Sequence, residues 1–369
     1  MRLTKSEKNT KGKASSGFSS RTSVGIDLTQ DAVRIVQLSG RNLNQVQLDK
    51  YAIARLPKNV IKGTTIHDYD QLVAYLQHAY TQVGGNSRNI VAAVPQTSAT
   101  IETVVYNQRD NQRDADVGLE DFVELEISQQ MPLDEVNYDY QDLGKSQGSI
   151  GQKVLVVAAR KEEIEPRLEA FDSAGLSLQF LDVDVLAQAN AFNYWMDKQY
   201  PELVSDKVMA VHISENEMSS LVLQNGQILY RQESSLGGEQ LNQLIQRTYQ
   251  VSEEQAKVMR KSDDKPADYQ VQIADRFNAQ IAQEIQRVLQ FYYTTQSGDQ
   301  FSNVRNIFLS GSASLQANLA ETIFSQTNTA AECINPIVSV SYGAKVDISE
   351  LQYDAAELTV AFGLALRGV

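Results

Sequence analysis

The sequence has 369 residues, of which 42% are hydrophobic and 21% are charged, and its formal net charge is −13. This length allows two domains with a core each, and the composition is that of a soluble globular protein. The acidic balance argues against a general nucleic-acid binder, which needs clustered Lys and Arg to displace counterions.

The chain begins with a basic segment that we expect to be a flexible tail, residues 1–22. It holds six basic residues and one acidic residue, and no apolar core follows them, so it does not resemble a secretory signal. An electrostatic tether to anionic lipid is its alternative role. No stretch of the sequence approaches the roughly 18–20 apolar residues that span a bilayer, and we therefore expect a cytoplasmic protein.

A strand–turn–strand–turn–strand unit follows, from about Val24 to Leu56. Its first turn lies at residues 29–31 and its second at Gly40-Arg41-Asn42, between strands rich in β-branched residues. Apolar residues at helical spacing then predict a helix at 69–82, which Gly84-Gly85 ends.

Residues 97–176 have the pattern of an inserted module. After a buried strand at 89–94, the predicted order within the module is strand, helix, strand, strand and helix. This order predicts two layers, with the helices packed on one small sheet.

The strand–turn unit recurs about half a chain later, from about Lys207 to Arg231, after a strand at 178–185 and a helix at 186–198. Its first turn is Ser214-Glu215-Asn216-Glu217, and its second contains Asn225-Gly226. Because the unit is repeated, we expect two related α/β lobes with mixed sheets that face each other.

The remainder of the second half is predicted to be mainly helical. Ser252-Glu253-Glu254-Gln255 is a capping box that opens one helix, and Ile273 to Tyr292 has the apolar spacing of a helix of about 25 residues. A strand at 304–309 and helices at 315–326 and 358–367 complete the chain. The single cysteine, Cys333, excludes an internal disulfide and fits a reducing compartment.

The two repeated turns suggest a phosphate site. A turn between strands can point successive backbone N–H groups at an anion, so two facing turns can bracket the phosphates of a nucleotide. Asp27 ends the strand before the first turn, where a carboxylate can hold Mg²⁺ through water, and Arg34 can reach a phosphate. The alternative for Asp27 is that it caps its own turn.

The ordered combination of motifs resembles the actin-like ATPase superfamily. It consists of Gly25-Ile26-Asp27 with Arg34 seven residues later, the inserted module, Leu236-Gly237-Gly238-Glu239-Gln240-Leu241 and a glycine motif after strand 304–309. Within the superfamily, the segments 131–140, 157–164, 288–293 and 362–367 resemble the PilM family of type IV pilus assembly proteins. The cell-division protein FtsA is similar more distantly.

The resemblance implies an α/β, two-lobed actin-like fold with duplicated RNase H-like cores and a 1C-type insert. Residues 23–96 and 177–206 correspond to the core of lobe 1 (1A), and 97–176 to the 1C module. Residues 207–238 and 301–369 correspond to the core of lobe 2 (2A), with the closing helix packed back on lobe 1. Residues 239–300 correspond to the helical subdomain 2B.

The resemblance also implies ATP or ADP with Mg²⁺ in the cleft between the lobes, and an N-terminal peptide of PilN docked between 1A and 1C. The chain would then join PilN and PilO at the cytoplasmic face of the inner membrane, near the pilus assembly and retraction ATPases and PilC, with homo-oligomers possible. The residues that match nucleotide-contacting positions are Asp27, Thr29, Gln30, Arg34, His212, Ser214, Gly237, Gly238, Gly311 and Ser312.

Several of these positions depart from the family pattern. Where the family has Asp-x-Gly in the second turn, this chain has His212-Ile213-Ser214. The Gly-Ser of the first turn is replaced by Thr29-Gln30, and the Gly-Gly of the adenosine motif by Ser310-Gly311. A Cβ at position 214 lies where the backbone should approach phosphate closely. We therefore expect nucleotide binding without rapid hydrolysis. Asp184 is a candidate to position water, and its alternative role is to cap the helix at 186–198.

Three functions remain open. The first is a scaffold that links the pilus motor to the inner-membrane complex, with a partner groove between the apolar side of module 97–176 and the adjacent lobe. The second is an active ATPase or sugar kinase, for which the sequence offers no clear carboxylate base. The third is an FtsA-like filament-forming protein, which should carry a C-terminal amphipathic anchor, whereas this sequence ends soon after Leu366-Arg367-Gly368.

Overall fold

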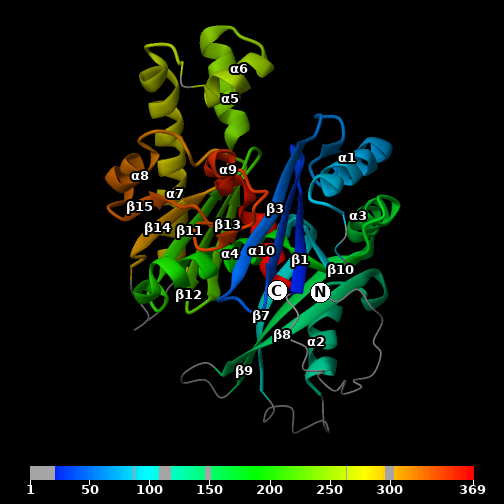
Figure 1. Ribbon diagram of the computed structural model, residues 1–369. Coiled ribbons are helices and arrows are strands. Elements are labelled where there is room, and N and C mark those ends of the chain that lie inside the picture. The colour runs from blue at the N-terminus through cyan, green and yellow to red at the C-terminus, as the bar shows by residue number, and fades with distance from the viewer. Residues whose placement is uncertain are drawn as a thin grey trace.

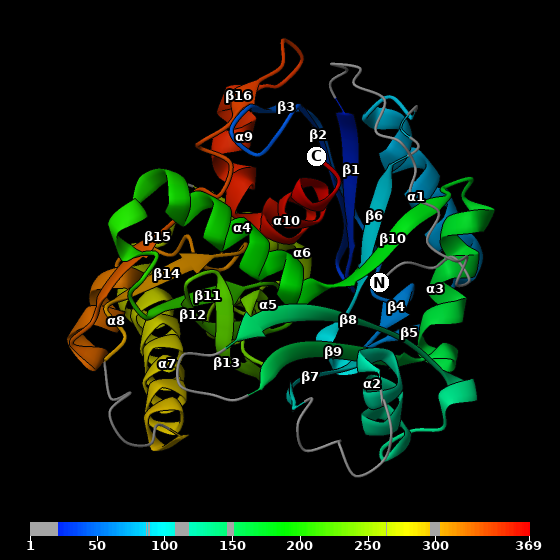
Figure 2. The same cartoon turned by 90° about the horizontal axis from the view of Figure 1, so that it is seen from below.

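The structure, a computed structural model, describes residues 21–85, 87, 89–107, 118–145, 151–262, 264–295 and 303–369. The predicted tail lies outside these residues except for Arg21 and Thr22, which belong to the first strand. Two lobes, each built on a mixed sheet, stand side by side, and a smaller sheet lies next to the first lobe (Figures 1 and 2).

The sheet of the first lobe contains the first repeated unit. Its strand order is β10-β6-β1-β2-β3-β16. The antiparallel strands are β1 (Arg21–Leu28), β2 (Ala32–Gly40) and β3 (Val46–Arg55), and the strands that extend the sheet in parallel are β6 (Ile90–Val94), β10 (Leu178–Val183) and β16 (Ser341–Tyr342). The last six residues of β1 and all of β6 are buried, as their continuous apolar runs predict.

The sheet of the second lobe repeats this arrangement, with the order β13-β12-β11-β14-β15. Its antiparallel strands are β11 (Val208–Ile213), β12 (Met218–Gln224) and β13 (Gln227–Ser234), and its parallel strands are β14 (Asn306–Ser310) and β15 (Ala330–Cys333). The predicted duplication of the strand–turn unit is therefore confirmed.

Helices α4 (Asp184–Gln199) and α10 (Thr359–Arg367) pack against each other, and α10 also packs on β1 and β2 of the first lobe (Figure 2). Two glycines allow this close approach. A Cβ on Gly25 would overlap the carbonyl oxygen of Ala361, and a Cβ on Gly363 would overlap that of Ala187. The closing helix, predicted at 358–367, thus lies against the first lobe.

The insert has the predicted order of elements. They are β7 (Ala99–Tyr106), α2 (Leu119–Ser128), β8 (Val136–Lys145), β9 (Gln152–Arg160) and α3 (Lys161–Ser173), with the strand order β7-β9-β8. A core that includes Tyr106, Val123 and Val154 joins α2 to the sheet. Helix α3 contacts β9 of the small sheet and also α1 (Tyr69–Gln82) of the first lobe. The hairpin of β4 (Ile61–Lys62) and β5 (Thr65–Ile66) precedes α1.

The second lobe carries the predicted helical section. Its helices are α5 (Gly238–Tyr249), α6 (Glu253–Lys261) and α7 (Asp275–Thr295), and α8 (Leu319–Thr327) and α9 (Ile348–Asp354) follow. The capping box is confirmed, because the Ser252 hydroxyl accepts the N–H of Gln255 at 3.2 Å. Helix α7 is preceded by a π-helical turn at Gln270–Ala274.

Helix α8 begins four residues later than the predicted 315–326. Asn318 at its N-terminus has a φ of 63°, so residues before it cannot continue the helix. No helix in the part of the chain that the structure describes is long and apolar enough to cross a membrane.

Candidate functional site

The turn after β1 is held by its own side chains. The Thr29 hydroxyl donates to the Asp31 carboxylate at 2.8 Å, and the Thr29 N–H donates to the Ala32 carbonyl at 3.1 Å. Gln30 is half-buried at the apex of this turn. Thr29 and Asp31, rather than Asp27, therefore stabilise the turn.

Arg34 lies behind this turn on β2, and its side chain is only 3% exposed. Its guanidinium donates to Thr29 Oγ1 at 2.8 Å, to Asp31 Oδ2 at 2.6 Å and to Glu357 Oε1 at 2.7 and 3.0 Å. Although burial opposes the charge, Asp31 and Glu357 hold the pKa of Arg34 above its usual value. The group expected to reach a phosphate is thus already paired with two carboxylates, and its phosphate role stays a prediction.

Asp27, at the end of β1, is 6% exposed, and its Oδ2 lies 3.6 Å from Nη1 of Arg34. Burial raises the pKa of Asp27 to about 6, although the charge of Arg34 opposes the shift. Among the residues that the structure describes, no group of three or more His, Cys, Asp or Glu side chains is arranged to hold a metal ion. The role of Asp27 with Mg²⁺ therefore stays a prediction.

The turn after β11 is closed by Ser214. The Ser214 hydroxyl accepts the N–H groups of Asn216 at 3.3 Å and Glu217 at 3.1 Å, and it donates to the Glu217 carbonyl at 3.0 Å. These N–H groups are the ones that the sequence predicts to face a phosphate. In this structure they already have an acceptor within their own turn.

Helix α5 begins directly beside this turn, at Gly237 and Gly238. The N–H of Gly238 donates to Ser214 O at 3.0 Å, that of Glu239 donates to Glu215 O at 2.8 Å, and that of Gly237 donates to Gln240 Oε1 at 2.7 Å. The N-terminus of α5 is thus bonded to the second turn and to its own capping side chain. A Cβ on Gly237 would overlap backbone atoms of Ser214 and Glu215, so this close contact requires glycine, whereas a Cβ on Gly238 would meet the side-chain ends of Arg260 and Glu215.

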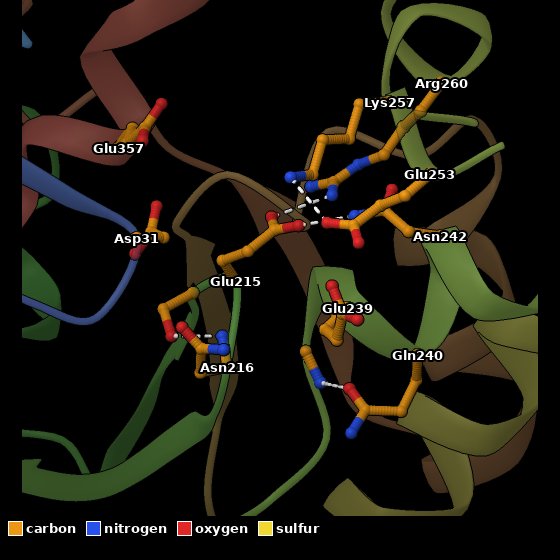
Figure 3. Close-up of polar contacts among 12 residues, drawn as sticks. Asp31, Glu215, Asn216, Glu239, Gln240, Asn242, Glu253, Lys257, Arg260 and Glu357 are labelled. Atoms are coloured by element: carbon orange, nitrogen blue, oxygen red, sulfur yellow. Dashed lines mark hydrogen bonds and ion pairs between the residues drawn. The ribbon is translucent and has the colours of Figure 1, made fainter. Parts of the chain in front are cut away.

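The Glu215 side chain points from the second turn to the helical section (Figure 3). Its carboxylate accepts from Arg260 Nη1 on α6 at 2.8 Å and from Asn242 Nδ2 on α5 at 2.6 Å. The Glu215–Arg260 pair is shielded, with side chains 15% and 8% exposed. The second turn, where a phosphate was expected, therefore carries a carboxylate that is already paired.

The other predicted residues lie at the ends of β11 and β14. His212 Nδ1 is 2.9 Å from Ser310 Oγ, and burial lowers the pKa of His212 to about 4, so the imidazole is neutral near pH 7. Gly311 has a φ of 95°, and its N–H donates to the Ala356 carbonyl at 2.9 Å. Ser312 Oγ is buried and has no hydrogen-bond partner among the described residues.

Asp184 is the first residue of α4, and its Oδ1 accepts the N–H groups of Gln96 at 2.9 Å and Val185 at 2.5 Å. Burial raises the pKa of Asp184 to about 7, with smaller contributions from Asp27 and Glu233. Burial and the charge of Glu233 also raise the pKa of Glu217. Carboxylates from the two lobes thus lie within electrostatic range of each other.

Sequence reasoning missed Glu357, Arg55, Glu215 and Arg260. Glu357 is the only charged residue in the otherwise apolar segment 355–366, which is a signal that it has a specific partner. Its partners, Arg34 and Arg55, come from the first lobe, and the contact could not be inferred from local sequence.

A separate groove of about 250 Å³ lies between the insert and the first lobe. Its lining is mainly apolar and comes from β6, β8, β9, α3, β10, α4 and α10. The lining residues are Val94, Asp139, Tyr140, Gln141, Leu155, Val157, Ala159, Ile164, Leu181, Asp182, Val183, Leu186 and Arg367. The Arg367 guanidinium pairs with Asp182 and lies over the Phe180 ring.

The residues around the two turns, where a nucleotide cleft was expected and which we call the cleft below, do not fit a Mg-nucleotide. The N–H groups of both the second turn and the α5 N-terminus have protein acceptors, and Arg34 is paired with carboxylates. Asp31 and Glu357 lie on one side of this region, and Glu215 and Glu239 lie toward the other (Figure 3). A polyphosphate would meet these negative charges with few available donors.

The comparisons with known proteins agree with the two-lobed fold. The family model of the type IV pilus assembly protein PilM matches residues 25–369. A PilM–PilN type IV pilus biogenesis complex is similar at 22% identity, with 94% of this chain and 98% of that chain covered and a TM-score of 0.76. The ethanolamine utilization protein EutJ from Carboxydothermus hydrogenoformans is similar at 14% identity, with 94% and 89% covered and a TM-score of 0.55.

MreB5 of Spiroplasma citri bound to ADP is similar at 9% identity, with 93% of this chain and 94% of that chain covered and a TM-score of 0.51. The same protein bound to AMPPNP gives 10% identity, the same coverage and a TM-score of 0.50. These likenesses show the actin-like ATPase fold, as the sequence predicted.

Proposed function

The chain belongs to the family of the type IV pilus assembly protein PilM, and from this membership we propose that it is a scaffold that docks the N-terminal peptide of PilN. The observation that carries the proposal is the groove between the insert and the first lobe. A solved relative of the same fold is a PilM–PilN complex. The sequence analysis expected a partner peptide between these two parts, and the groove supports this expectation.

The groove suits an extended peptide because two sheet edges meet there. β8 is the edge strand of the three-stranded sheet, and β10 is the edge strand of the first lobe's sheet. Consecutive residues of both strands, 139–141 and 181–183, line the groove. An edge strand offers backbone N–H and C=O groups for a peptide to pair with, and side-chain pockets add specificity.

The apolar part of the lining supplies the surface that a docked peptide would bury. Leu155, Val157 and Leu186 are half-buried in the free chain, so part of each side chain remains available. The polar side chains of Asp139, Asp182 and Arg367 provide charged groups that can fix the direction of the peptide.

The proposal places the protein at the cytoplasmic face of the inner membrane as a peripheral member of the PilN and PilO alignment complex. There it links this complex to the pilus assembly and retraction ATPases and to PilC. The family membership supports the pilus assignment, and the groove supports the PilN contact. Association through a docked peptide needs no membrane span of the chain itself.

The experiment is a calorimetric titration of a synthetic PilN N-terminal peptide into the purified chain. The wild type should bind one peptide saturably, and Val157→Glu should weaken binding at least about 100-fold because a carboxylate enters the apolar lining. Val105→Glu is the matched control, since Val105 is 47% exposed on β7 of the same small sheet and does not line the groove. No saturable binding by the wild type would contradict the docking role.

An active ATPase or kinase is the alternative, and MreB5, bound to ADP and AMPPNP, supports a nucleotide in this fold. In this alternative, ATP or ADP with Mg²⁺ binds at the ten nucleotide-contacting positions named in the sequence analysis, of which Asp27 is the first and Ser312 the last. Asp184 positions water. The test is ATP turnover at saturating Mg²⁺, where about 1 per second or more contradicts the scaffold.

An FtsA-like filament is the remaining alternative. Sedimentation measures the size of the assembly, and so detects both a filament and any smaller homo-oligomer. Long polymers that form with nucleotide would favour the filament. A species of fixed size that binds PilN peptide is the result that the scaffold predicts.

A further inference from the structure

Glu357 connects the C-terminal part of the chain to the first lobe, next to the second lobe. It lies in the turn Ala355–Leu358, between the second lobe and α10, and the carbonyl of its neighbour Ala356 accepts the N–H of Gly311 in the second lobe at 2.9 Å. Its carboxylate accepts hydrogen bonds from Arg34 and Arg55 of the first lobe, including 2.7 Å from Arg55 Nη2. Although burial opposes ionisation, these two arginines lower the pKa of Glu357.

Lys58 connects the two lobes at an exposed position. It follows β3 in the first lobe, and its ammonium lies 3.1 Å from Glu239 on α5 and 2.7 Å from Glu253 on α6. Lys257 of the second lobe shares Glu253 at 2.7 Å. The first lobe is thus connected to the helical section by an exposed ion pair.

Within the second lobe, Glu215 connects the phosphate-type turn to the helical section through Arg260 and Asn242. Figure 3 shows these side chains pointing toward one another from the turn, α5 and α6. The carboxylate therefore accepts the hydrogen bonds that a ligand between the turn and the helices would otherwise accept.

A Mg-nucleotide could enter only by displacing these contacts. Its phosphates would have to take Arg34 from two carboxylates and take the N–H groups of residues 216 and 217 from Ser214. Each displaced carboxylate would then be left close to the added negative charge. Removing one partner of a buried ion pair is strongly unfavourable, and the phosphates would replace it with repulsion.

We infer that the cleft of this chain is closed by its own ion pairs and does not bind a Mg-nucleotide. The carboxylates of Glu357 and Glu215 accept hydrogen bonds that phosphate oxygens would otherwise accept, and Lys58 connects the first lobe to the helical section. This inference goes beyond the docking function and does not depend on the groove.

The first test uses the wild-type chain. MgATP and MgADP are titrated calorimetrically, and thermal unfolding is followed with each at up to about 5 mM. We expect no saturable heat and a change in Tm below about 1 °C, whereas a Kd of about 50 μM would raise Tm by several degrees. Saturable one-to-one binding with a Kd below about 1 mM overturns the inference.

Binding of the PilN peptide by the same sample separates this result from the docking role. A chain that binds peptide and no nucleotide supports both proposals. A chain that binds nucleotide and peptide overturns only this inference, and one that binds nucleotide but no peptide overturns both.

The second test asks whether Glu357 keeps Arg34 and Arg55 paired. Glu357→Gln should increase amide hydrogen exchange at least about tenfold in residues 27–34 and 355–358, because the paired arginines lose their counter-charge. Glu284→Gln is the matched control, since its ion pair with Arg287 lies within α7 and does not cross the cleft. Exchange that is equal in Glu357→Gln and wild type contradicts the inference, and the nucleotide titration decides it if this variant does not fold.

Discussion

The groove and the cleft differ in how many of their groups already have partners within the chain, whether hydrogen-bonding partners for polar groups or packing partners for apolar ones. The groove is lined by apolar side chains that are only half covered, such as Leu155 and Val157, and by two sheet edges. The cleft holds more charge, but its main charged groups, Arg34, Glu357 and Glu215, are paired within the chain. A site is therefore better judged by its uncommitted groups than by its residue types.

The comparison also explains how one fold can lose one site and keep another. A nucleotide site needs free donors at two turns, whereas a peptide groove needs exposed edge strands and apolar surface. In this chain, single side chains such as Glu357 and Ser214 remove donors from the cleft, and neither lines the groove. The two sites share the support of α10, which follows Glu357 and ends with Arg367, and of α4, which begins with Asp184 and carries Leu186.

The largest effect is expected where the two sites share their support. In Gly363→Ala the new Cβ overlaps the carbonyl of Ala187, so α10 must move away from α4. We expect a loss of about 3 kcal/mol or more in the free energy of unfolding, with weaker peptide binding. Urea unfolding measures it, and Gly118→Ala, where a Cβ contacts only the Asp121 side chain, is the control. Unchanged stability of Gly363→Ala would mean that α10 is not seated as described.

Glu357→Gln should affect the cleft alone. Because Arg34 and Arg55 lose a buried counter-charge, we expect a loss of about 2–3 kcal/mol at pH 7, with peptide affinity unchanged. The folded pKa of Glu357 is lowered from 4.5, so its stabilisation is present above this value and is lost as pH falls further. Urea unfolding at pH 7 and below pH 4 should therefore show a smaller difference at acid pH. A difference that does not depend on pH would contradict the ion-pair account.

Asp184→Asn sharpens the comparison by removing a carboxylate whose pKa is raised mainly by burial. Asn keeps an Oδ1 acceptor for the N–H groups of Gln96 and Val185. The folded pKa of Asp184 is raised to about 7, so the wild type loses stability as pH rises through this value. We expect the variant to be about 2 kcal/mol more stable at pH 8 and nearly equal at pH 4. A destabilised variant at pH 8 would show that the charge is required.

The smallest effect is expected at Lys58, whose side chain is 61% exposed. Lys58→Ala should lower the free energy of unfolding by less than about 1 kcal/mol, and the difference should disappear in 1 M salt. Urea unfolding at low and high salt measures it. A larger loss that persists in salt would assign Lys58 a packing role instead.

The sequence predicted the repeated strand units, the order of elements in the insert and most helices, because apolar periodicity and turn residues are local signals. It missed β15 and β16, which are short and have few apolar residues, since such strands are defined by their partners. In the cleft, the sequence identified the two turns but not the side chains that pair with one another there. Arg34 and Glu357 are 323 residues apart, and only the fold brings them together.

The most direct test of the account is amide hydrogen exchange of the chain with and without saturating PilN peptide. The account predicts slower exchange in 139–141, 155–159 and 181–186, which line the groove, and unchanged exchange in the cleft turns 27–34 and 214–217. Protection confined to the cleft turns, or absent from the groove, would contradict the claim that this protein acts by docking a peptide between its insert and its first lobe.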